Sequence, residues 1–221
     1  MNYVETLKHL IDNQIVAILR VSSADIAIKA TRALYNAGIK SIEVTMNVPD
    51  ILSILEQLNQ EYSEKDLLIG AGTVLDEVSC RMAILSGAEF IVTPTTNEAV
   101  IKCANRYQKP MICGALTPTE IVTAMELGVN LIKLYPASIS TYGYLKAVKD
   151  PLPQAMIAPT GGVNLDNIVQ WKENGASAFG IAGEFSKLAN AEKYDELEKV
   201  ARQYVNLLSD SEKNVQVNNE K

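Results

Sequence analysis

One lysine lies in the middle of a short apolar run that ends at a proline. Residues 130–137 read NLIKLYPA, and the lysine is Lys133. Side chains of an extended strand alternate between two faces, so Leu131, Lys133 and Tyr135 would share one face. An ammonium among apolar side chains is costly unless it is paired, and a buried lysine that becomes a neutral amine can attack a carbonyl. Lys133 is therefore a candidate Schiff-base nucleophile. The alternative, which is commoner for lysines in general, is that it ends its strand and reaches water.

A carboxylate occupies a similar place in another apolar run, at residues 41–45. Alternation puts Ile42 and Val44 on one face and places Glu43 on the other, pointing into a closed sheet. A buried Glu–Lys pair can serve structure alone, but apolar residues often stabilise a core as well as such a pair does. We therefore interpret Glu43 and Lys133 as a proton-transfer group and a nucleophile.

Short apolar runs alternate along the chain with longer segments of helical spacing. Helical spacing covers residues 24–37, 51–62, 75–85 and 168–173, and an amphipathic helix is expected at the N-terminus. The apolar runs predict strands at residues 15–20, 41–46, 67–71, 90–93, 111–113, 131–135, 156–158 and 179–182. Such alternation is typical of a parallel sheet, and RVSS follows the first strand instead of a glycine-rich dinucleotide fingerprint. We predict an α/β fold, a closed (β/α)8 TIM barrel with an N-terminal helix.

The composition indicates one catalytic domain that acts on a small molecule. The chain has 221 residues, 48% of them hydrophobic, which suits a single (β/α)8 barrel at residues 1–208. Residues 209–221 are polar without an apolar period, so a flexible C-terminal tail is predicted. A net charge of −6 argues against nucleic acid or a membrane as partner, since both favour a basic surface. The N-terminus lacks a signal-peptide pattern and no apolar run could span a bilayer, so we expect a cytoplasmic protein.

Metal and histidine chemistry have little support in the sequence. Cys80, Cys103 and Cys113 lack metal-ligand spacing and are expected to be free thiols. The single histidine, His9, falls in the expected N-terminal helix and is interpreted as a surface residue. A histidine-dependent triad or a His-rich metal site is therefore not expected.

The C-terminal ends of the strands form the active site in a (β/α)8 barrel. The first predicted strand ends at Arg20, whose planar guanidinium suits a carboxylate. The seventh ends in PTGG, where Gly161 and Gly162 offer consecutive backbone N–H groups suited to a phosphate. The eighth runs into GIAG, which ends at Gly183 and adds donors from the next position around the barrel. The strand ends thus predict a site for an anionic substrate.

Seven motifs, in this order, resemble the aldolase family that cleaves 2-keto-3-deoxy-6-phosphogluconate (KDPG) and 4-hydroxy-2-oxoglutarate (KHG). They are VAILR (16–20), IEVT (42–45), GAGTV (70–74), FIVTP (90–94), GALTPTE (114–120), IKLYPA (132–137) and PTGGV (159–163). The resemblance extends over residues 16–187. It implies a class I aldolase that needs no metal or other cofactor, binds a small 2-keto acid, forms a homotrimer, and releases pyruvate and an aldehyde.

The resemblance also implies roles for individual residues. Lys133 corresponds to the Schiff-base lysine and Glu43 to the general acid/base. The implied substrate-binding residues are Arg20 and Thr73 for the carboxylate, Pro94 for the pocket wall, and Thr160, Gly161, Gly162, Gly183 and Glu184 near the hydroxyls and phosphate.

Two positions depart from the family pattern. Some members carry an arginine after IEVT, where this chain has MNVP, so Arg20 would contact the carboxylate alone. Many members have a serine beside the phosphate where this chain has Glu184, and a carboxylate facing a phosphate is repulsive by about 1 kcal/mol or more. Either Glu184 turns away and only its backbone N–H serves, or the preferred substrate lacks a phosphate. KDPG, KHG and uronate-derived sugar acids all stay open as substrates.

Two other functions compete with the aldolase. A phosphate-binding barrel isomerase or epimerase would use the same glycines, but it needs a second acid/base or a metal that the sequence does not offer. A non-catalytic protein that binds sugar acids would keep the barrel without the chemistry. The candidate nucleophile, acid/base and carboxylate contact together favour the aldolase.

Overall fold

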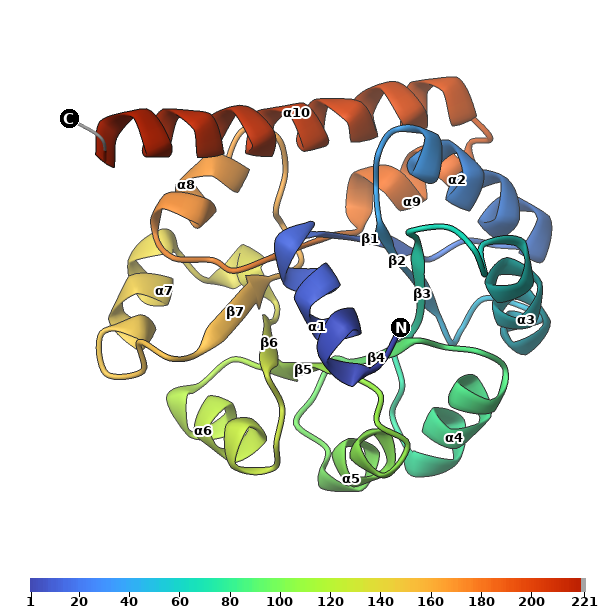
Figure 1. Ribbon diagram of the computed structural model, residues 1–221, viewed down its shortest axis with the longest axis horizontal. Coiled ribbons are helices and arrows are strands. Elements are labelled where there is room, and N and C mark those ends of the chain that lie inside the picture. The colour runs from blue at the N-terminus through green and yellow to red at the C-terminus, as the bar shows by residue number, and fades with distance from the viewer. Residues whose placement is uncertain (220–221) are drawn as a thin grey trace.

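A ring of parallel strands lies at the centre of the computed structural model, which describes residues 1–219 (Figure 1). The strands are β1 (Ile15–Leu19), β2 (Ser41–Thr45), β3 (Leu68–Gly72), β4 (Phe90–Thr93), β5 (Met111–Ala115), β6 (Leu131–Leu134), β7 (Met156–Pro159) and β8 (Phe179–Ile181). In the described chain their order is β7-β6-β5-β4-β3-β2-β1-β8. A parallel bridge between Thr160 and Gly180 joins the end of β7 to β8 and closes the ring. The predicted (β/α)8 TIM barrel with an N-terminal helix is confirmed.

Helices surround the ring on its outside (Figure 1). They are α2 (Ala24–Asn36), α3 (Ile51–Glu61), α4 (Glu77–Leu85), α5 (Glu98–Arg106), α6 (Pro118–Glu126), α7 (Tyr142–Lys149), α8 (Ile168–Glu173), α9 (Gly183–Asn190) and α10 (Tyr194–Asn219), with a short 3-10 helix, η1 (Ala137–Ile139), after β6. Every predicted strand end lies within two residues of the observed one. Helix α4 begins later than residue 75 because the carboxylate of Asp76 caps it, accepting the backbone N–H of Ser79 at 2.8 Å.

Helix α1 (Tyr3–Asp12) covers the N-terminal end of the barrel (Figure 1). A capping box between Asn2 and Glu5 fixes its start. The hydroxyl of Tyr3 donates to Oδ1 of Asn130, just before β6, at 2.7 Å. Leu10 is fully buried against the residues that fill the barrel. The helix therefore closes this end of the barrel and leaves the C-terminal end for a substrate.

Alternating residues of the strands fill the inside of the barrel. Phe90 enters the interior opposite Gly70, where an added Cβ would lie 2.5 Å from the ring. Glycine at that position thus makes room for the aromatic ring. The interior layer consists of Leu10, Val16, Leu68, Phe90, Val92, Ile112, Leu131, Ala158 and Ala178. Branched and aromatic side chains of this kind make the barrel a packed core rather than a pore.

Helix α10 packs along α2 and α9. Its packed face carries Leu197, Ala201 and Tyr204, each fully buried. A flexible polar tail was predicted from residue 209, but the structure continues this helix through Asn219. Residues 209–219 contain neither glycine nor proline, so nothing in them ends a helix that its packed first part has begun. Residues 220–221 of the predicted tail lie outside the described part.

Candidate active site

Glu43 and Lys133 reach one cavity inside the barrel. The space measures about 210 Å³ when the part that is open to solvent is included. Its wall is formed by Val16, Ile18, Glu43, Val92, Ile112, Lys133, Ala158, Thr160 and Gly180. Glu43 and Lys133 are the titratable residues of this wall, and they come from β2 and β6. An acid and an amine thus share a largely apolar space, as the alternation along both strands predicts.

The carboxyl group of Glu43 is buried in the barrel. Its residue is 1% exposed, and Oε1 has no hydrogen-bond partner among the described residues. A Cβ at Gly72 would lie 1.7 Å from this oxygen, so only glycine leaves room for the carboxyl there. Burial raises the pKa of Glu43 above its usual range, and the charges of Lys133 and Arg20 oppose that rise. Buried carboxyl groups with a raised pKa are common among catalytic acids and bases.

Lys133 is buried in the middle of the sheet. It pairs with Gly114 of β5 and Ala158 of β7. The residue is 6% exposed, and its Nζ lies 5.3 Å from the centre of the Tyr135 ring. The buried, inward orientation rules out the alternative in which this lysine ends its strand in water. A carbonyl that enters the cavity would meet the amine directly.

Arg20 directly follows β1 and is exposed to solvent. Its backbone N–H donates to Oγ of Ser186 at 3.0 Å, and its carbonyl accepts from Nδ2 of Asn190 at 3.1 Å. Both partners belong to α9, so this helix fixes the backbone from which the guanidinium extends. The charge of Arg20 also opposes the rise in the pKa of Glu43. The position suits an anionic group bound above Lys133.

Thr73 and Pro94 follow the neighbouring strands β3 and β4, and both are half-buried. Thr73 has φ = +58°, in the left-handed region that a β-branched residue rarely adopts. Such a conformation costs about 1–3 kcal/mol and is concentrated at functional sites. The backbone of Pro94 packs against Gly114, where a Cβ would come within 2.1 Å. Neither residue contributes to the wall of the 210 Å³ cavity, and both stand at its C-terminal edge.

Two loops provide backbone donors at the same end of the barrel. Gly161 and Gly162 both have positive φ, at 82° and 100°, so this turn after β7 requires glycine. The bridge between Thr160 and Gly180 holds the turn against the end of β8. Gly183 begins α9 and is exposed, with open space where a Cβ would stand. The predicted phosphate loops are therefore neighbours in space.

Glu184 is the second residue of α9, and its carboxylate has a partner in α10. The hydroxyl of Tyr204 donates to Oε2 of Glu184 at 2.8 Å. Burial and the neighbouring carboxylate both raise the pKa of Tyr204, so the hydroxyl keeps its proton. The structure thus shows the carboxylate of Glu184 hydrogen-bonded to a residue of α10.

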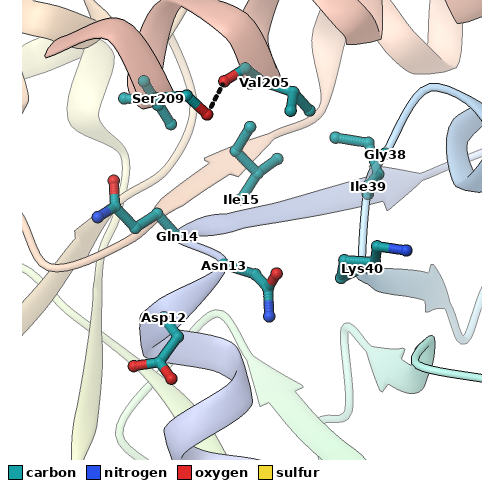
Figure 2. Close-up of a pocket in the computed structure, with 10 residues that line it drawn as sticks. Asp12, Asn13, Gln14, Ile15, Gly38, Ile39, Lys40, Val205 and Ser209 are labelled. Carbon is teal, nitrogen blue, oxygen red and sulfur yellow. Dashed lines mark hydrogen bonds between the residues drawn. The ribbon is translucent and has the colours of Figure 1, made fainter. Parts of the chain in front are cut away.

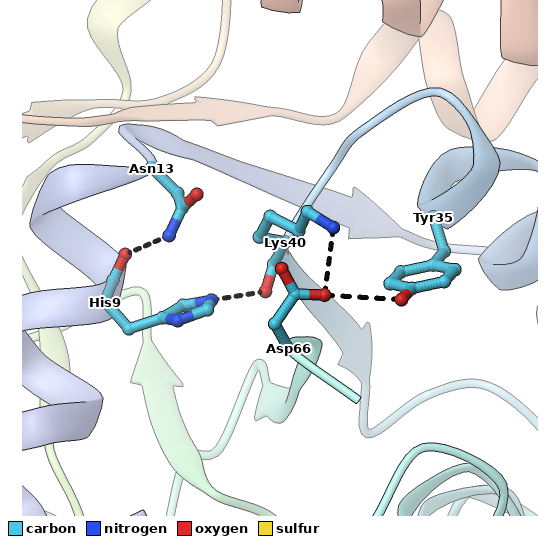
Figure 3. A network of polar contacts seen from close by, with 5 residues as sticks. All are labelled: His9, Asn13, Tyr35, Lys40 and Asp66. Carbon is cyan, nitrogen blue, oxygen red and sulfur yellow. Dashed lines mark hydrogen bonds and ion pairs between the residues drawn. The ribbon is translucent and has the colours of Figure 1, made fainter. Parts of the chain in front are cut away.

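A second, larger cavity lies at the N-terminal end of the barrel (Figure 2). It measures about 470 Å³ when the part that is open to solvent is included. Its wall consists of Asp12, Asn13, Gln14, Ile15, Gly38, Ile39, Lys40, Val205, Leu208 and Ser209. Nζ of Lys40 is already paired with Asp66 at 2.9 Å, and that carboxylate also accepts from Tyr35 (Figure 3). The amine of this wall, that of Lys40, is thus engaged in an ion pair. We therefore place the chemistry in the smaller cavity.

His9 is half-buried at this N-terminal end, rather than on the surface. Its Nε2 donates to the carbonyl oxygen of Lys40 at 3.0 Å and so ties α1 to the start of β2 (Figure 3). Cys80, Cys103 and Cys113 are buried free thiols. In the described chain, no group of three or more His, Cys, Asp or Glu side chains is placed to hold a metal ion. No described helix is both long and apolar enough to cross a membrane.

Three further residues contact the predicted site residues. Tyr135 lies over the amine of Lys133, and its place on the same strand face was visible in the sequence. Ser186 and Tyr204 hold Arg20 and Glu184 from helices that follow β8. Their spacing along the chain carries no signal for these contacts, because the contacts depend on how α9 and α10 pack.

Comparisons with known proteins agree with this geometry. A family model described as "KDPG and KHG aldolase" matches residues 6–202. The 2-dehydro-3-deoxy-6-phosphogalactonate aldolase of Escherichia coli (strain K12) is 33% identical over 171 residues, which cover 77% of this chain and 83% of that protein. A solved structure described as "Native KDPGal structure" has a TM-score of 0.84 at 30% identity and covers 90% of this chain and 96% of its own. A cube-shaped cage designed by fusing symmetric oligomeric domains has a TM-score of 0.87 at 28% identity, covering 94% of this chain and 76% of its own. The chain belongs to the KDPG and KHG aldolase family.

Proposed function

We propose that this protein is a class I aldolase that cleaves a 2-keto-3-deoxy sugar acid, or KHG, to pyruvate and an aldehyde. The observation that carries the proposal is the shared cavity in which Lys133 and Glu43 are both buried. Membership of the KDPG and KHG aldolase family supports it. We place the protein in the cytoplasm, in keeping with a substrate that is a soluble sugar acid.

The proposed reaction begins with attack of the Lys133 amine on the C2 carbonyl. Loss of water from the carbinolamine gives a protonated imine, which accepts the electron pair when the C3–C4 bond breaks. Glu43 takes the proton of the C4 hydroxyl, directly or through one water, so that C4 leaves as an aldehyde. The enamine then takes a proton at C3, and hydrolysis of the imine frees pyruvate and restores the amine.

The strand ends hold the substrate in register for this chemistry. Arg20 offers a planar pair of donors for the C1 carboxylate, which sets C2 against the amine. Thr73 and Pro94 flank this end of the site, and Thr160 extends the cavity wall towards the turn at Gly161 and Gly162. In this arrangement a phosphate at C6 would lie between that turn and the start of α9.

The substrate itself is tested by pyruvate release. The E. coli relative is named for 2-keto-3-deoxy-6-phosphogalactonate, which differs from KDPG in the configuration at C4. We expect pyruvate from at least one of KDPG, its galactonate epimer and KHG, measured with lactate dehydrogenase and NADH. If none of the three, nor their unphosphorylated counterparts, yields pyruvate although binding is measurable, the chain is a sugar-acid binding protein.

An isomerase or epimerase fits the cavity less well. Such an enzyme needs two proton-transfer groups or a metal. The described cavity wall offers one carboxyl group, that of Glu43, and one amine, that of Lys133. An amine and one acid are the set that a Schiff-base aldolase uses.

We also propose that the protein is a homotrimer that associates through α4. The loop before this helix and the helix itself expose Leu75, Val78, Met82 and Leu85, at 53%, 63%, 45% and 67%. The spacing puts them on one side, and an exposed apolar stripe of this kind usually marks an interface. A cage built from symmetric oligomeric domains contains a chain of the same fold, which supports self-association.

Replacing Val78 and Leu85 together by glutamate should dissociate the trimer, because two charges would be buried in the contact. Light scattering coupled to gel filtration should show the mass fall from about three times 24.1 kDa to 24.1 kDa. The matched control is Val4→Glu, which charges a residue that is 70% exposed on α1 and should leave the mass unchanged. A wild-type monomer, or a double variant that stays trimeric, would contradict this interface.

A further inference from the structure

The hydroxyl of Tyr204 joins α10 to the start of α9. Tyr204 is fully buried, and its ring stacks edge to face on Phe185, with centroids 5.4 Å apart. The packing fixes the ring, so the hydroxyl can reach only what lies at its end. It donates to Oε2 of Glu184 at 2.8 Å. A hydrogen bond from a fixed donor to a carboxylate is among the stronger ones in proteins.

The bond lies at the start of α9, just after β8. Helix α10, which carries Tyr204, packs against α9 and also against α8, the helix that follows β7. Thr160, in the connection from β7 to α8, is bridged to Gly180, three residues before α9. Tyr204 therefore holds Glu184 at the junction of the two loops that we assign to the substrate phosphate.

The carboxylate of Glu184, in the first turn of α9, has two possible partners: the backbone N–H groups of that turn and the hydroxyl of Tyr204. The free backbone N–H groups of that turn attract it, as they would attract a phosphate. If the carboxylate of Glu184 turned to these groups, it would occupy them and repel a dianion. The bond to Tyr204 keeps it on the opposite side, and the N–H groups stay available.

We propose that Tyr204 is a positioning residue that sets the preference of this aldolase for phosphorylated substrates by keeping the Glu184 carboxylate away from the phosphate loops. The proposal rests on the proposed function. It accounts for an acidic residue at a position where the ligand is also negative. The tyrosine acts through Glu184 and does not touch the substrate.

The test compares one sugar acid with and without its phosphate. In Tyr204→Phe the ring stays packed while the donor is lost, so the KM for the 6-phosphate should rise by about 10-fold. Its kcat, and the KM for the same sugar acid without phosphate, should change less than about 2-fold. Adding Glu184→Gln to this variant removes the charge and should restore the KM for the phosphorylated substrate.

The matched control is Tyr35→Phe. This change also removes a tyrosine–carboxylate hydrogen bond, to Asp66, but at the N-terminal end of the barrel (Figure 3). It should leave both KM values unchanged. Equal losses on the two substrates, an unchanged KM for the 6-phosphate, or a double variant without recovery would each overturn the role of Tyr204.

Binding of inorganic phosphate separates this proposal from the proposed function. Calorimetry should show weaker phosphate binding in Tyr204→Phe than in the wild type, and recovery in the double variant. This readout needs no turnover. If the wild type bound phosphate in this pattern but released no pyruvate, the aldolase assignment would fail while the Tyr204 proposal stood. Phosphate binding that is equal in all variants would contradict the Tyr204 proposal and leave the aldolase assignment unaffected.

Discussion

Pyruvate release should fall by about 10⁴-fold or more when Lys133 is replaced by methionine. The amine forms the bond to C2, so its loss removes the covalent route rather than weakening a contact. Methionine has nearly the same length, and it replaces a buried cation by an apolar group in a wall formed largely by apolar residues. The variant should therefore fold at least as stably as the wild type, which thermal unfolding would show.

Trapping gives the direct evidence for this lysine. Incubation with pyruvate and borohydride should reduce the imine to a stable secondary amine, and mass spectrometry of the peptides should place the adduct on Lys133. Lys146→Met is the control, because Lys146 is exposed on α7 and should be needed for neither activity nor trapping. An adduct on another lysine, or activity that survives in the Lys133 variant, would refute the assignment.

Replacing Glu43 by glutamine should lower kcat by about 10²–10⁴-fold, the usual contribution of a positioned acid/base group. The amide has the size of the carboxyl group and still fits against Gly72, but it cannot carry the proton from the C4 hydroxyl. Imine formation with pyruvate should be slowed as well, since the same group transfers protons there. Rapid-quench and steady-state measurements on one substrate would show both effects.

The pH dependence follows from the direction of the Glu43 shift. Burial raises the pKa of Glu43 above 4.5, and the form that accepts the C4 proton is the ionised one. Activity should therefore be full above this raised pKa and fall as the pH drops through it, so that the acid limb of kcat lies above pH 4.5. The limb should vanish in Glu43→Gln and persist in Glu126→Gln, which changes an exposed carboxylate on α6. An acid limb that is unaltered by Glu43→Gln would contradict the role of this residue.

The barrel and the inward orientation of Glu43 and Lys133 could be predicted, because the alternation of side chains along a strand depends only on neighbouring residues. The runs around Glu43 and Lys133 are short enough for the alternation to decide which side chains point inward. The motif GAG at residues 70–72 can also be read from the sequence, but the structural role of its glycines cannot. Gly72 clears space for the carboxyl group of Glu43, and this depends on the register of β2 against β3, which pairs Thr45 with Gly72.

The contacts of the late helices could not be predicted in this way. The partner of Glu184 is 20 residues away, on a helix whose approach to α9 is set by tertiary packing. The polar composition after residue 208 predicts a flexible tail because these residues have no apolar face. The structure continues α10 through Asn219, since a helix already formed can extend through polar residues. His9 was expected on the surface for a similar reason: its partner is a backbone carbonyl, which no sequence pattern reveals.

Helix α1 closes the N-terminal end of the barrel, and this bears on the order in which substrates bind and products leave. Leu10 and the apolar side chains packed against it fill the N-terminal end of the barrel. Substrates and products must therefore enter and leave at the C-terminal ends of the strands. In the proposed mechanism the three-carbon fragment is bound to Lys133, deep in the barrel, and the aldehyde half lies nearer the C-terminal ends of the strands. We therefore expect the aldehyde to leave first and pyruvate last, and in the synthetic direction we expect pyruvate to bind before the aldehyde.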